Sequence, residues 1–250
     1  MGTEVVDYII VDPFVVPADQ QPHFAERLIH LPGCYQVNGR TRPISSHIPS
    51  RAECGLPASG FVFCCFSASY KITPKVFDVW MRLLGAVEGS VLWLLESNPL
   101  ATANLKRAPE TQGVAADRLI FAPTLPNPDH LARFAMADLF LDTLPYNAHT
   151  VASDALWGGC PVVTCAGQTF ASRVAGSLLR AVGLPELVTT SLAEYEALAL
   201  TLARNPDQCR GVREKLQERR LNSALFDSAR FTRHLEKAYE AMWSLQNMGL

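Results

Sequence analysis

Short apolar runs alternate with amphipathic stretches through the middle of the chain. Apolar residues recur at every third or fourth position from Val76 to Val87, which is typical of one helical face. Six runs have the length and composition of buried strands: residues 60–66, 90–95, 118–122, 138–142, 160–165 and 187–189. Strands that alternate with helices predict βαβ units, and hence an α/β domain whose Rossmann-like parallel sheet has helices on both faces.

Helical patterns fill the intervals between these strands. They cover residues 73–87, 101–112, 127–137, 149–158 and 168–182. From residue 191 onward only helices are predicted, and the last of them spans 227–248. No internal repeat is found. We therefore expect residues 59–250 to form one α/β lobe with C-terminal helices.

The N-terminal part of the chain, residues 1–58, has a different pattern. One strand is expected over 5–11 and one helix over 22–29, followed by a linker rich in Pro, Ser and Gly over 39–57. One strand and one helix cannot enclose a core. We therefore expect this arm to pack loosely and to leave apolar side chains more exposed than a complete domain would: Tyr8, Ile9, Ile10 and Phe14.

Composition and charge exclude several classes of protein. Hydrophobic residues make up 48% of the 250 residues and the formal net charge is only −2, so the chain is not intrinsically disordered. A chain with so little net charge lacks the excess of positive charge with which proteins bind nucleic acid or an anionic membrane. The longest apolar run, 61–66, is far shorter than the roughly 18 residues of a membrane span.

The seven cysteines show no metal-binding or disulfide pattern. Their number is odd and no two have C-x-x-C spacing: Cys34, Cys54, Cys64, Cys65, Cys160, Cys165 and Cys209. Several lie inside apolar runs. Free, buried thiols in a reducing cytoplasm are therefore favoured over a structural zinc site.

Polar side chains follow four of the predicted strands. They lie in residues 67–71, 123–133, 143–154 and 166–169. Ligands bind open parallel sheets outside the carboxyl ends of the strands, so these segments are expected to meet at one edge. Together they offer Lys71, His130, Arg133, His149 and several hydroxyls.

The segment after the fourth strand favours phosphate binding. Thr150 is a suitable N-cap, and the N–H groups of Val151 and Ala152 would open a helix that attracts anions. Asp154, one turn further, is placed to accept a ribose hydroxyl, and Lys71 is placed to neutralise a diphosphate. His130 and Arg133, three residues apart on one helix, would hold a planar base.

The site interpretation competes with a plainer one. Taken singly, each of these residues is equally well explained as a helix cap, a loop residue or a solvated charge. Their convergence at one edge favours a nucleoside diphosphate site. No G-x-G-x-x-G motif is present, which excludes the usual dinucleotide signature.

Several long stretches resemble one family. They are residues 66–73, 90–95, 118–133, 139–158 and 169–179. Over essentially the whole chain they are similar to the C-terminal catalytic lobe of the O-linked N-acetylglucosamine transferases, in particular to their bacterial SPINDLY-like branch. The resemblance implies one lobe of a GT-B glycosyltransferase, which transfers N-acetylglucosamine from its UDP donor to Ser or Thr hydroxyls of acceptor proteins with inversion, without a metal or other cofactor.

The resemblance also implies a donor-binding set. Lys71 matches a lysine that contacts the diphosphate, and the backbone at Leu125 matches a position that meets uracil. His130 and Arg133 match the uracil-binding pair, and Asp154 matches the ribose-binding aspartate. The diphosphate-binding H-T-T signature corresponds to His149, Thr150 and Val151.

Three positions depart from the family pattern. Val151 stands where the second Thr of H-T-T is usual, which removes a hydroxyl donor. Animal members have Gln at the position of Ala68 and Lys at that of Asn127. The presence of His149 favours the N-acetylglucosamine type over the GDP-fucose-type protein O-fucosyltransferases of plants, which remain an alternative.

The family's tetratricopeptide repeats and most of its N-terminal lobe have no counterpart in this sequence. By this resemblance, residues 1–58 are the remnant of the N-terminal lobe and a linker, and residues 59–250 are the nucleotide-sugar-binding C-terminal lobe. The proposed catalytic base belongs to that lobe, so no catalytic residue is assigned here. We expect a truncated or excised lobe that acts with a separate N-terminal lobe or repeat-containing chain. A non-catalytic nucleotide-binding module and an inert or protein-interaction remnant are the alternatives.

Overall fold

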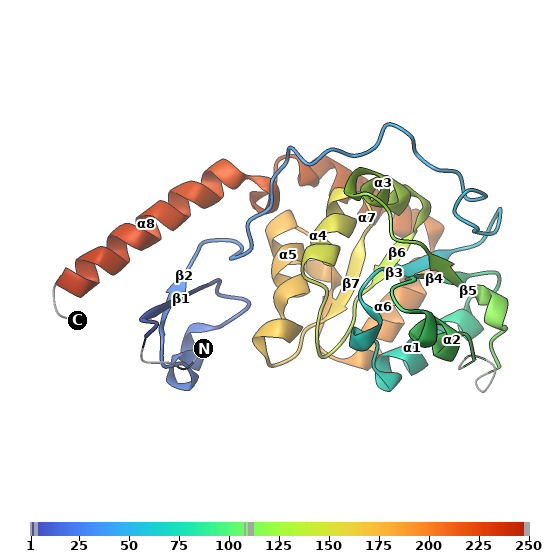
Figure 1. Cartoon of the computed structure of the whole chain (residues 1–250), viewed down its shortest axis with the longest axis horizontal. Helices are drawn as coiled ribbons and strands as arrows, with labels where there is room; N and C mark the ends of the chain where they lie inside the picture. The colour runs from blue at the N-terminus through green and yellow to red at the C-terminus, as the bar shows by residue number, and fades with distance from the viewer. Residues whose placement is uncertain (1, 3–4, 108, 110–112, 248–250) are drawn as a thin grey trace.

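The main body is a six-stranded parallel sheet (Figure 1). The computed structural model describes residues 2, 5–107, 109 and 113–247. The strand order is β5-β4-β3-β6-β7-β8. The strands are β3 (Val62–Cys65), β4 (Val91–Leu95), β5 (Leu119–Ala122), β6 (Leu139–Leu141), β7 (Val162–Cys165) and β8 (Val188–Thr189). All six predicted strands are confirmed, with slightly shorter bounds.

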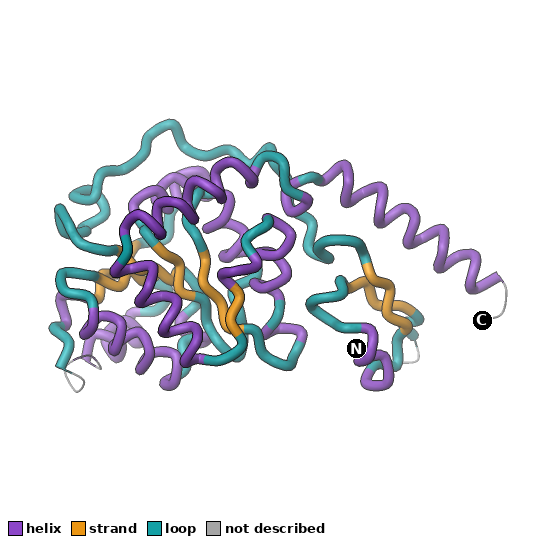
Figure 2. Tube along the Cα trace, turned by 180° about the vertical axis from the view of Figure 1, so that it is seen from behind, coloured by secondary structure: helices purple, strands orange, loops and turns teal. Residues whose placement is uncertain are grey.

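Helices cover both faces of this sheet, as predicted (Figure 2). Right-handed crossovers place helices on opposite faces when the chain reverses direction, as it does between β5 and β6. Helix α1 packs against α6 in one layer, and α3 packs against α4 and α4 against α5 in the other. The helices are α1 (Pro74–Ala86), α2 (Pro99–Arg107), α3 (Asn127–Arg133), α4 (Thr150–Trp157), α5 (Val174–Val182), α6 (Leu192–Arg204), α7 (Pro206–Arg220) and α8 (Ser228–Asn247).

The helix predicted over 22–29 is wrong. A 3-10 turn, Ala18–His23, is followed by a strand, β2 (Arg27–His30), which pairs in parallel with β1 (Tyr8–Val11). Pro22 lies inside the turn, and the backbone is already extended at Phe24, so no helix continues from it. Leu28 and Ile29 instead pair with Ile9 and Ile10, which places apolar side chains of two short segments side by side.

Three other helices differ from their predicted bounds by more than one residue. The helix expected over 168–182 begins only at Val174, because Thr169 and Ser172 form a capping box around a separate 3-10 turn, Phe170–Ser172. Helix α3 ends at Arg133 and passes into another 3-10 turn. Helix α2 ends at Arg107. Predicted helical positions 108, 110–112 and 248 lie outside the described residues.

The arm packs more firmly than expected. The Asp12 carboxylate is fully buried and accepts a hydrogen bond of 2.6 Å from the Ser177 hydroxyl on α5. Arg173 Nε donates to the carbonyl oxygen of Phe14 at 2.7 Å. The arm is therefore anchored to the α/β body through its 11–16 turn. The four side chains predicted to be exposed are half-buried: Tyr8, Ile9, Ile10 and Phe14.

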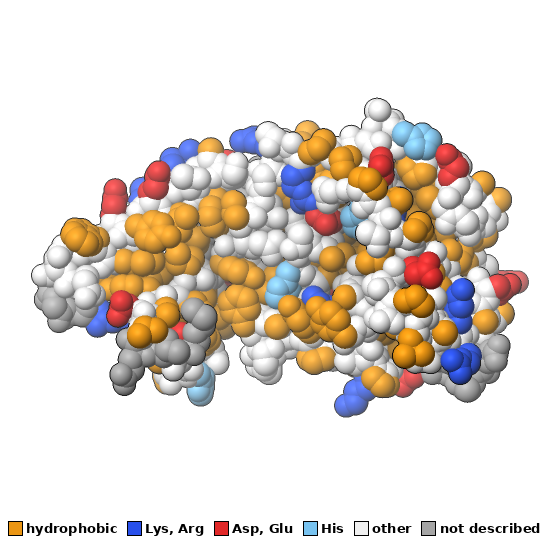
Figure 3. Space-filling view, viewed as in Figure 1, with side chains coloured by type: hydrophobic (Ala, Val, Ile, Leu, Met, Phe, Trp, Pro, Cys, Tyr) orange, Lys and Arg blue, Asp and Glu red, His pale blue; other side chains and the backbone are white. Residues whose placement is uncertain are grey.

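Helix α8 extends away from the body and runs beside the arm (Figure 1). The Tyr8 hydroxyl donates to the carbonyl oxygen of Met242 at 3.4 Å. Ala238 is the only buried residue among the described positions of α8, while Tyr239 and Trp243 are 57% and 71% exposed. Figure 3 shows hydrophobic side chains gathered over α8 and the arm. No helix in the described part of the chain has both the length and the apolar character needed to cross a membrane.

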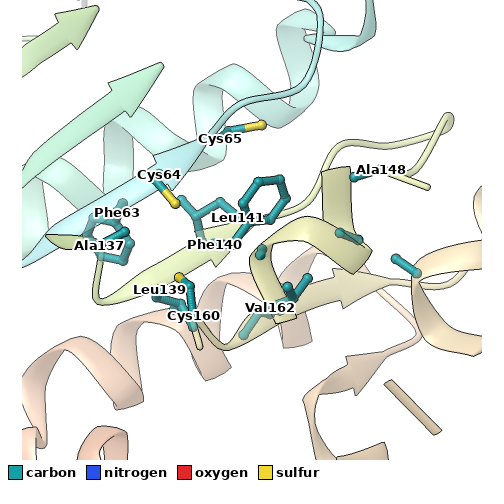
Figure 4. Close-up of a cluster of buried hydrophobic side chains, with 14 of the residues drawn as sticks. Phe63, Cys64, Cys65, Ala137, Leu139, Phe140, Leu141, Ala148, Cys160 and Val162 are labelled. Carbon is teal, nitrogen blue, oxygen red and sulfur yellow. The ribbon is translucent and has the colours of Figure 1, made fainter. Parts of the chain in front are cut away.

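The core lies between the sheet and its two helical layers. Figure 4 shows Cys64 and Cys160 among the aromatic and aliphatic side chains of β3, β6 and β7. All seven cysteines are free, as predicted, and all but the half-buried Cys54 are buried. Burial raises the pKa of the Cys65 thiol to about 12, so this thiol is unreactive at neutral pH.

Candidate functional site

A buried carboxylate organises the loop that follows β6. Asp142 Oδ1 accepts hydrogen bonds from the backbone N–H groups of Thr143, at 2.8 Å, and Ala148, at 2.6 Å. Its Oδ2 accepts from the Thr164 hydroxyl at 2.6 Å. Asp142 therefore fixes both ends of the loop that leads into α4. Sequence reasoning missed this residue, although an acidic side chain at the end of an apolar strand is a usable signal.

The environment of Asp142 disfavours its charge. Complete burial raises the pKa of this carboxyl from 3.8 to about 7, although three hydrogen bonds and the nearby Lys71 oppose the shift. The loop thus depends on a carboxyl that titrates close to neutral pH.

Helix α4 begins at the carboxyl edge of the sheet with free donors. Thr150 was predicted as its N-cap, but it is the first helical residue, and His149 is the cap and makes no side-chain capping bond. The loop gives His149 a non-helical conformation, which moves the start of the helix by one residue. Within the described residues, the N–H groups of Thr150, Val151 and Ala152 donate no hydrogen bond. Such a helix start binds anions.

Lys71 lies beside the loop that leads into α4. Its Nζ donates to the carbonyl oxygen of Asn147 at 2.9 Å and stands 3.6 Å from the centre of the Tyr146 ring. The Tyr146 ring in turn contacts the His149 ring, with centroids 5.1 Å apart. Partial burial lowers the pKa values of both Lys71 and His149. The structure therefore brings Lys71 and His149 together, as the convergence prediction requires.

His130 and Arg133 lie together on α3, but at different depths. Arg133 is only 1% exposed, its Nη1 donates to the carbonyl oxygen of Pro123 at 2.7 Å, and its guanidinium stacks 4.4 Å from the Phe66 ring centre. Its Nη2 bonds to His130 Nδ1. Arg133 thus lies beneath His130 and orients its ring.

The protonation of His130 follows from these contacts. Burial, followed by repulsion from Arg133 and Arg42, lowers the His130 pKa to about 4, so the ring is neutral at pH 7. A guanidinium only donates, which makes Nδ1 the acceptor and leaves the ring hydrogen on Nε2. His130 therefore presents one N–H donor on the side of the ring away from Arg133.

Asp154 has a partner that the sequence did not suggest. It lies one turn into α4, is 6% exposed, and its Oδ1 accepts from Nη2 of Arg42 in the linker. Burial raises the Asp154 pKa and the Arg42 charge opposes the shift. Nothing in a Pro- and Ser-rich linker marks one of its arginines for this contact. Leu125, the last predicted site residue, is 38% exposed in the loop after β5.

The predicted residues thus form two groups on either side of the α4 start. Lys71 and His149 lie at the loop that leads into α4. His130 and Arg133 on α3 and Asp154 on α4 lie near Arg42, since the Arg42 charge acts on both His130 and Asp154. The two helices pack against each other. Free N–H groups, a lysine, a neutral histidine and a carboxylate make this edge suited to a phosphorylated, hydroxyl-bearing ligand.

Comparison with known proteins decides the family. The model of glycosyl transferase family 41 matches residues 36–235. The chain belongs to this family. The resemblance inferred from the sequence motifs is confirmed, and the parallel sheet with helices around it is that of a GT-B glycosyltransferase lobe.

Relatives of this family 41 chain are similar over nearly all of its length. A protein of Arabidopsis thaliana, named probable UDP-N-acetylglucosamine–peptide N-acetylglucosaminyltransferase SEC, is 36% identical over 99% of this chain. A Petunia hybrida protein with the same enzyme name and the designation SPINDLY is 35% identical over 97%. The solved structure of a mutant O-GlcNAc transferase of Thermobaculum terrenum matches 95% of this chain with 36% identity and a TM-score of 0.84.

The chain covers a much smaller share of these relatives than they cover of the chain. The chain spans 26% of the length of each of the two plant relatives and 45% of the solved bacterial chain. This family 41 sequence therefore corresponds to the C-terminal region of longer proteins.

Proposed function

We propose that this chain is the donor-binding lobe of a protein O-GlcNAc transferase-like enzyme. The lobe binds UDP-N-acetylglucosamine, whose sugar is transferred to Ser or Thr hydroxyls of acceptor proteins. The observation that carries the proposal is the start of α4, which offers three free N–H donors beside Lys71 and a buried aspartate one turn further. Family membership and the names of the relatives support the same donor.

Each group has a defined task in this proposal. The N–H groups of Thr150 and Val151 and the Lys71 ammonium bind the diphosphate, which also stabilises the UDP leaving group as negative charge develops on it. The Nε2–H of His130, held by Arg133, donates to a carbonyl of the base. Asp154 accepts from ribose hydroxyls. Leu125 flanks the base through its backbone.

His149 has its own place in the proposal. Its ring stands against Tyr146, next to Lys71, and its pKa is lowered by burial. A neutral imidazole at this position donates to the diphosphate or to the sugar without adding a charge. We do not assign it as the catalytic base, which we place in an N-terminal lobe outside the residues of this chain.

The proposed donor binding uses no metal ion. In the described part of the chain, no three His, Cys, Asp or Glu side chains are grouped so that they would hold a metal ion. Lys71 and the helix start supply the positive potential that a diphosphate needs.

Nucleotide titration tests the donor assignment. We expect calorimetry on the purified chain to give binding of UDP and much weaker binding of GDP, because Leu125 and His130, which we propose contact the base, match uracil-binding positions of the family. Asp154→Ala is expected to weaken UDP binding by about 1–3 kcal/mol, the range for removing the partner of a buried polar group.

The control is Asp207→Ala, since the Asp207 side chain is 96% exposed and lies on α7 away from the site. It should leave UDP affinity unchanged. Tighter binding of GDP than of UDP would favour the protein O-fucosyltransferase alternative, and equal UDP affinity for wild type and Asp154→Ala would contradict the ribose assignment.

A further inference from the structure

Residues 38–42, which include the start of the linker, are docked along the first two turns of α4. Ser153 Oγ donates to Asn38 Oδ1 at 2.5 Å, and the Trp157 indole N–H donates to the carbonyl oxygen of Arg42 at 3.1 Å. Between these two bonds the Arg42 side chain reaches the Asp154 carboxylate and also donates to Ser153 Oγ at 3.4 Å. Figure 1 shows this stretch of chain passing over α4 and α3. A segment outside the α/β body therefore forms part of its ligand-binding edge.

The contact occupies only one oxygen of Asp154. Arg42 bonds to Oδ1, and no hydrogen bond to Oδ2 is found among the described residues. The Arg42 side chain is 23% exposed and that of Asp154 only 9%, so the pair lies at the boundary between protein and solvent. One oxygen is thus fixed by the protein and the other is left for a donor from outside.

A carboxylate in this position needs a positive partner. Burial favours the neutral acid, which has one acceptor oxygen and one O–H donor, whereas two hydroxyl groups of a sugar are bound best by an ionised carboxylate. The Arg42 charge opposes the effect of burial on Asp154. The bond from Arg42 Nη2 also fixes the position of Oδ1.

We propose that Arg42 is a positioning residue of the donor site, which holds Oδ1 of Asp154 so that Oδ2 accepts from vicinal ribose hydroxyls. This inference rests on the proposed function, because it takes Asp154 as the ribose-binding residue. The inference gives the linker a role in nucleotide recognition. The motifs found in the α/β body do not include this residue. Arg42 contacts the carboxylate and not the reacting atoms, so its effect is on binding.

The role of Arg42 is tested by comparing the binding of two ligands. UDP and 2′,3′-dideoxyuridine diphosphate differ only in the ribose hydroxyls, and their dissociation constants are measured by calorimetry on the whole chain. Wild type is expected to prefer UDP by about 10- to 100-fold, the range for hydrogen bonds to a charged group. Arg42→Met is expected to narrow this preference to about threefold or less, and Arg42→Lys to restore most of it.

Arg40→Met is the matched control. Arg40 belongs to the same linker and pairs with Asp227, at 3.6 Å, on the surface. Its replacement should leave the preference for UDP unchanged. If Arg42→Met does not fold, as judged by circular dichroism, Arg42→Gln gives the same comparison without the charge.

The possible results separate the inference from the proposed function. Equal weakening of both ligands by Arg42→Met, with the preference kept, would show that Arg42 supports the fold alone and would overturn the inference. Tighter UDP binding by Arg42→Met would show that Arg42 blocks the ribose site and would overturn it as well. A wild type that binds both ligands equally would instead contradict the ribose assignment of Asp154 itself.

Discussion

The purified chain is expected to bind UDP and yet to transfer no N-acetylglucosamine to a peptide. A GT-B enzyme needs both lobes, because one supplies the electrostatics around the donor and the other largely positions the acceptor and accepts its proton. This chain matches 45% of the solved bacterial transferase. Tyr239 and Trp243 are exposed on α8, and exposed apolar side chains that are grouped together mark protein interaction surfaces.

The test is a radiolabelled-sugar transfer assay. The chain is measured alone, and again after mixing with a separately expressed N-terminal lobe of a related protein. We expect transfer above background only in the mixture. Asp154→Ala in the mixture should abolish most of that transfer, which ties the recovered activity to the donor site of this chain.

Transfer by the chain alone would contradict this prediction. It would mean that the catalytic base lies within these residues, and His149 would be the first to mutate, since it stands beside Lys71 at the start of α4. Transfer without a partner would also exclude the non-catalytic alternative.

Asp142→Ala is expected to lower the free energy of unfolding by about 3–5 kcal/mol. It leaves two backbone N–H groups and the Thr164 hydroxyl buried without their acceptor, and each such loss costs about 1–3 kcal/mol. For a chain of this size the midpoint of thermal unfolding should fall by roughly 10 °C. Asp207→Ala, on the exposed surface of α7, should leave it unchanged.

The same carboxyl should make stability depend on pH. Because its pKa is about 7 in the folded chain and 3.8 in the unfolded chain, the folded state holds a proton that the unfolded state has released between these values. Stability from this group is therefore complete below about pH 4 and is lost as the pH rises through 7, by about 4 kcal/mol in total.

Asp142→Asn isolates this effect. The amide has the shape of the neutral acid and does not titrate, so the variant should lack the loss of stability that wild type shows from pH 4 to 7. Urea unfolding at several pH values measures both profiles. Parallel profiles for wild type and Asp142→Asn would show that Asp142 does not titrate near neutral pH.

The sequence by itself determined the α/β body of this protein. Buried strands such as 62–65 are continuous apolar runs, and helices such as α1 repeat their apolar residues with a helical period, so both are recognisable without tertiary information. The carboxyl ends of parallel strands meet at one edge, which is why the sequence predicts that Lys71, His149 and Asp154 lie at one edge of the sheet. The family followed from motifs carried by the same strands and loops.

Only the tertiary structure decided the conformation of the arm and the contacts of Arg133 and Arg42. Arg27–His30 is a strand because Tyr8–Val11 lies beside it, a pairing that local propensity does not contain. Arg133 is buried because Phe66 and Pro123 surround it, although arginine is usually exposed. Arg42 reaches Asp154 across more than a hundred residues of sequence, since the linker folds back over α4. Contacts between segments so distant along the chain depend on the packed fold, and no local pattern encodes them.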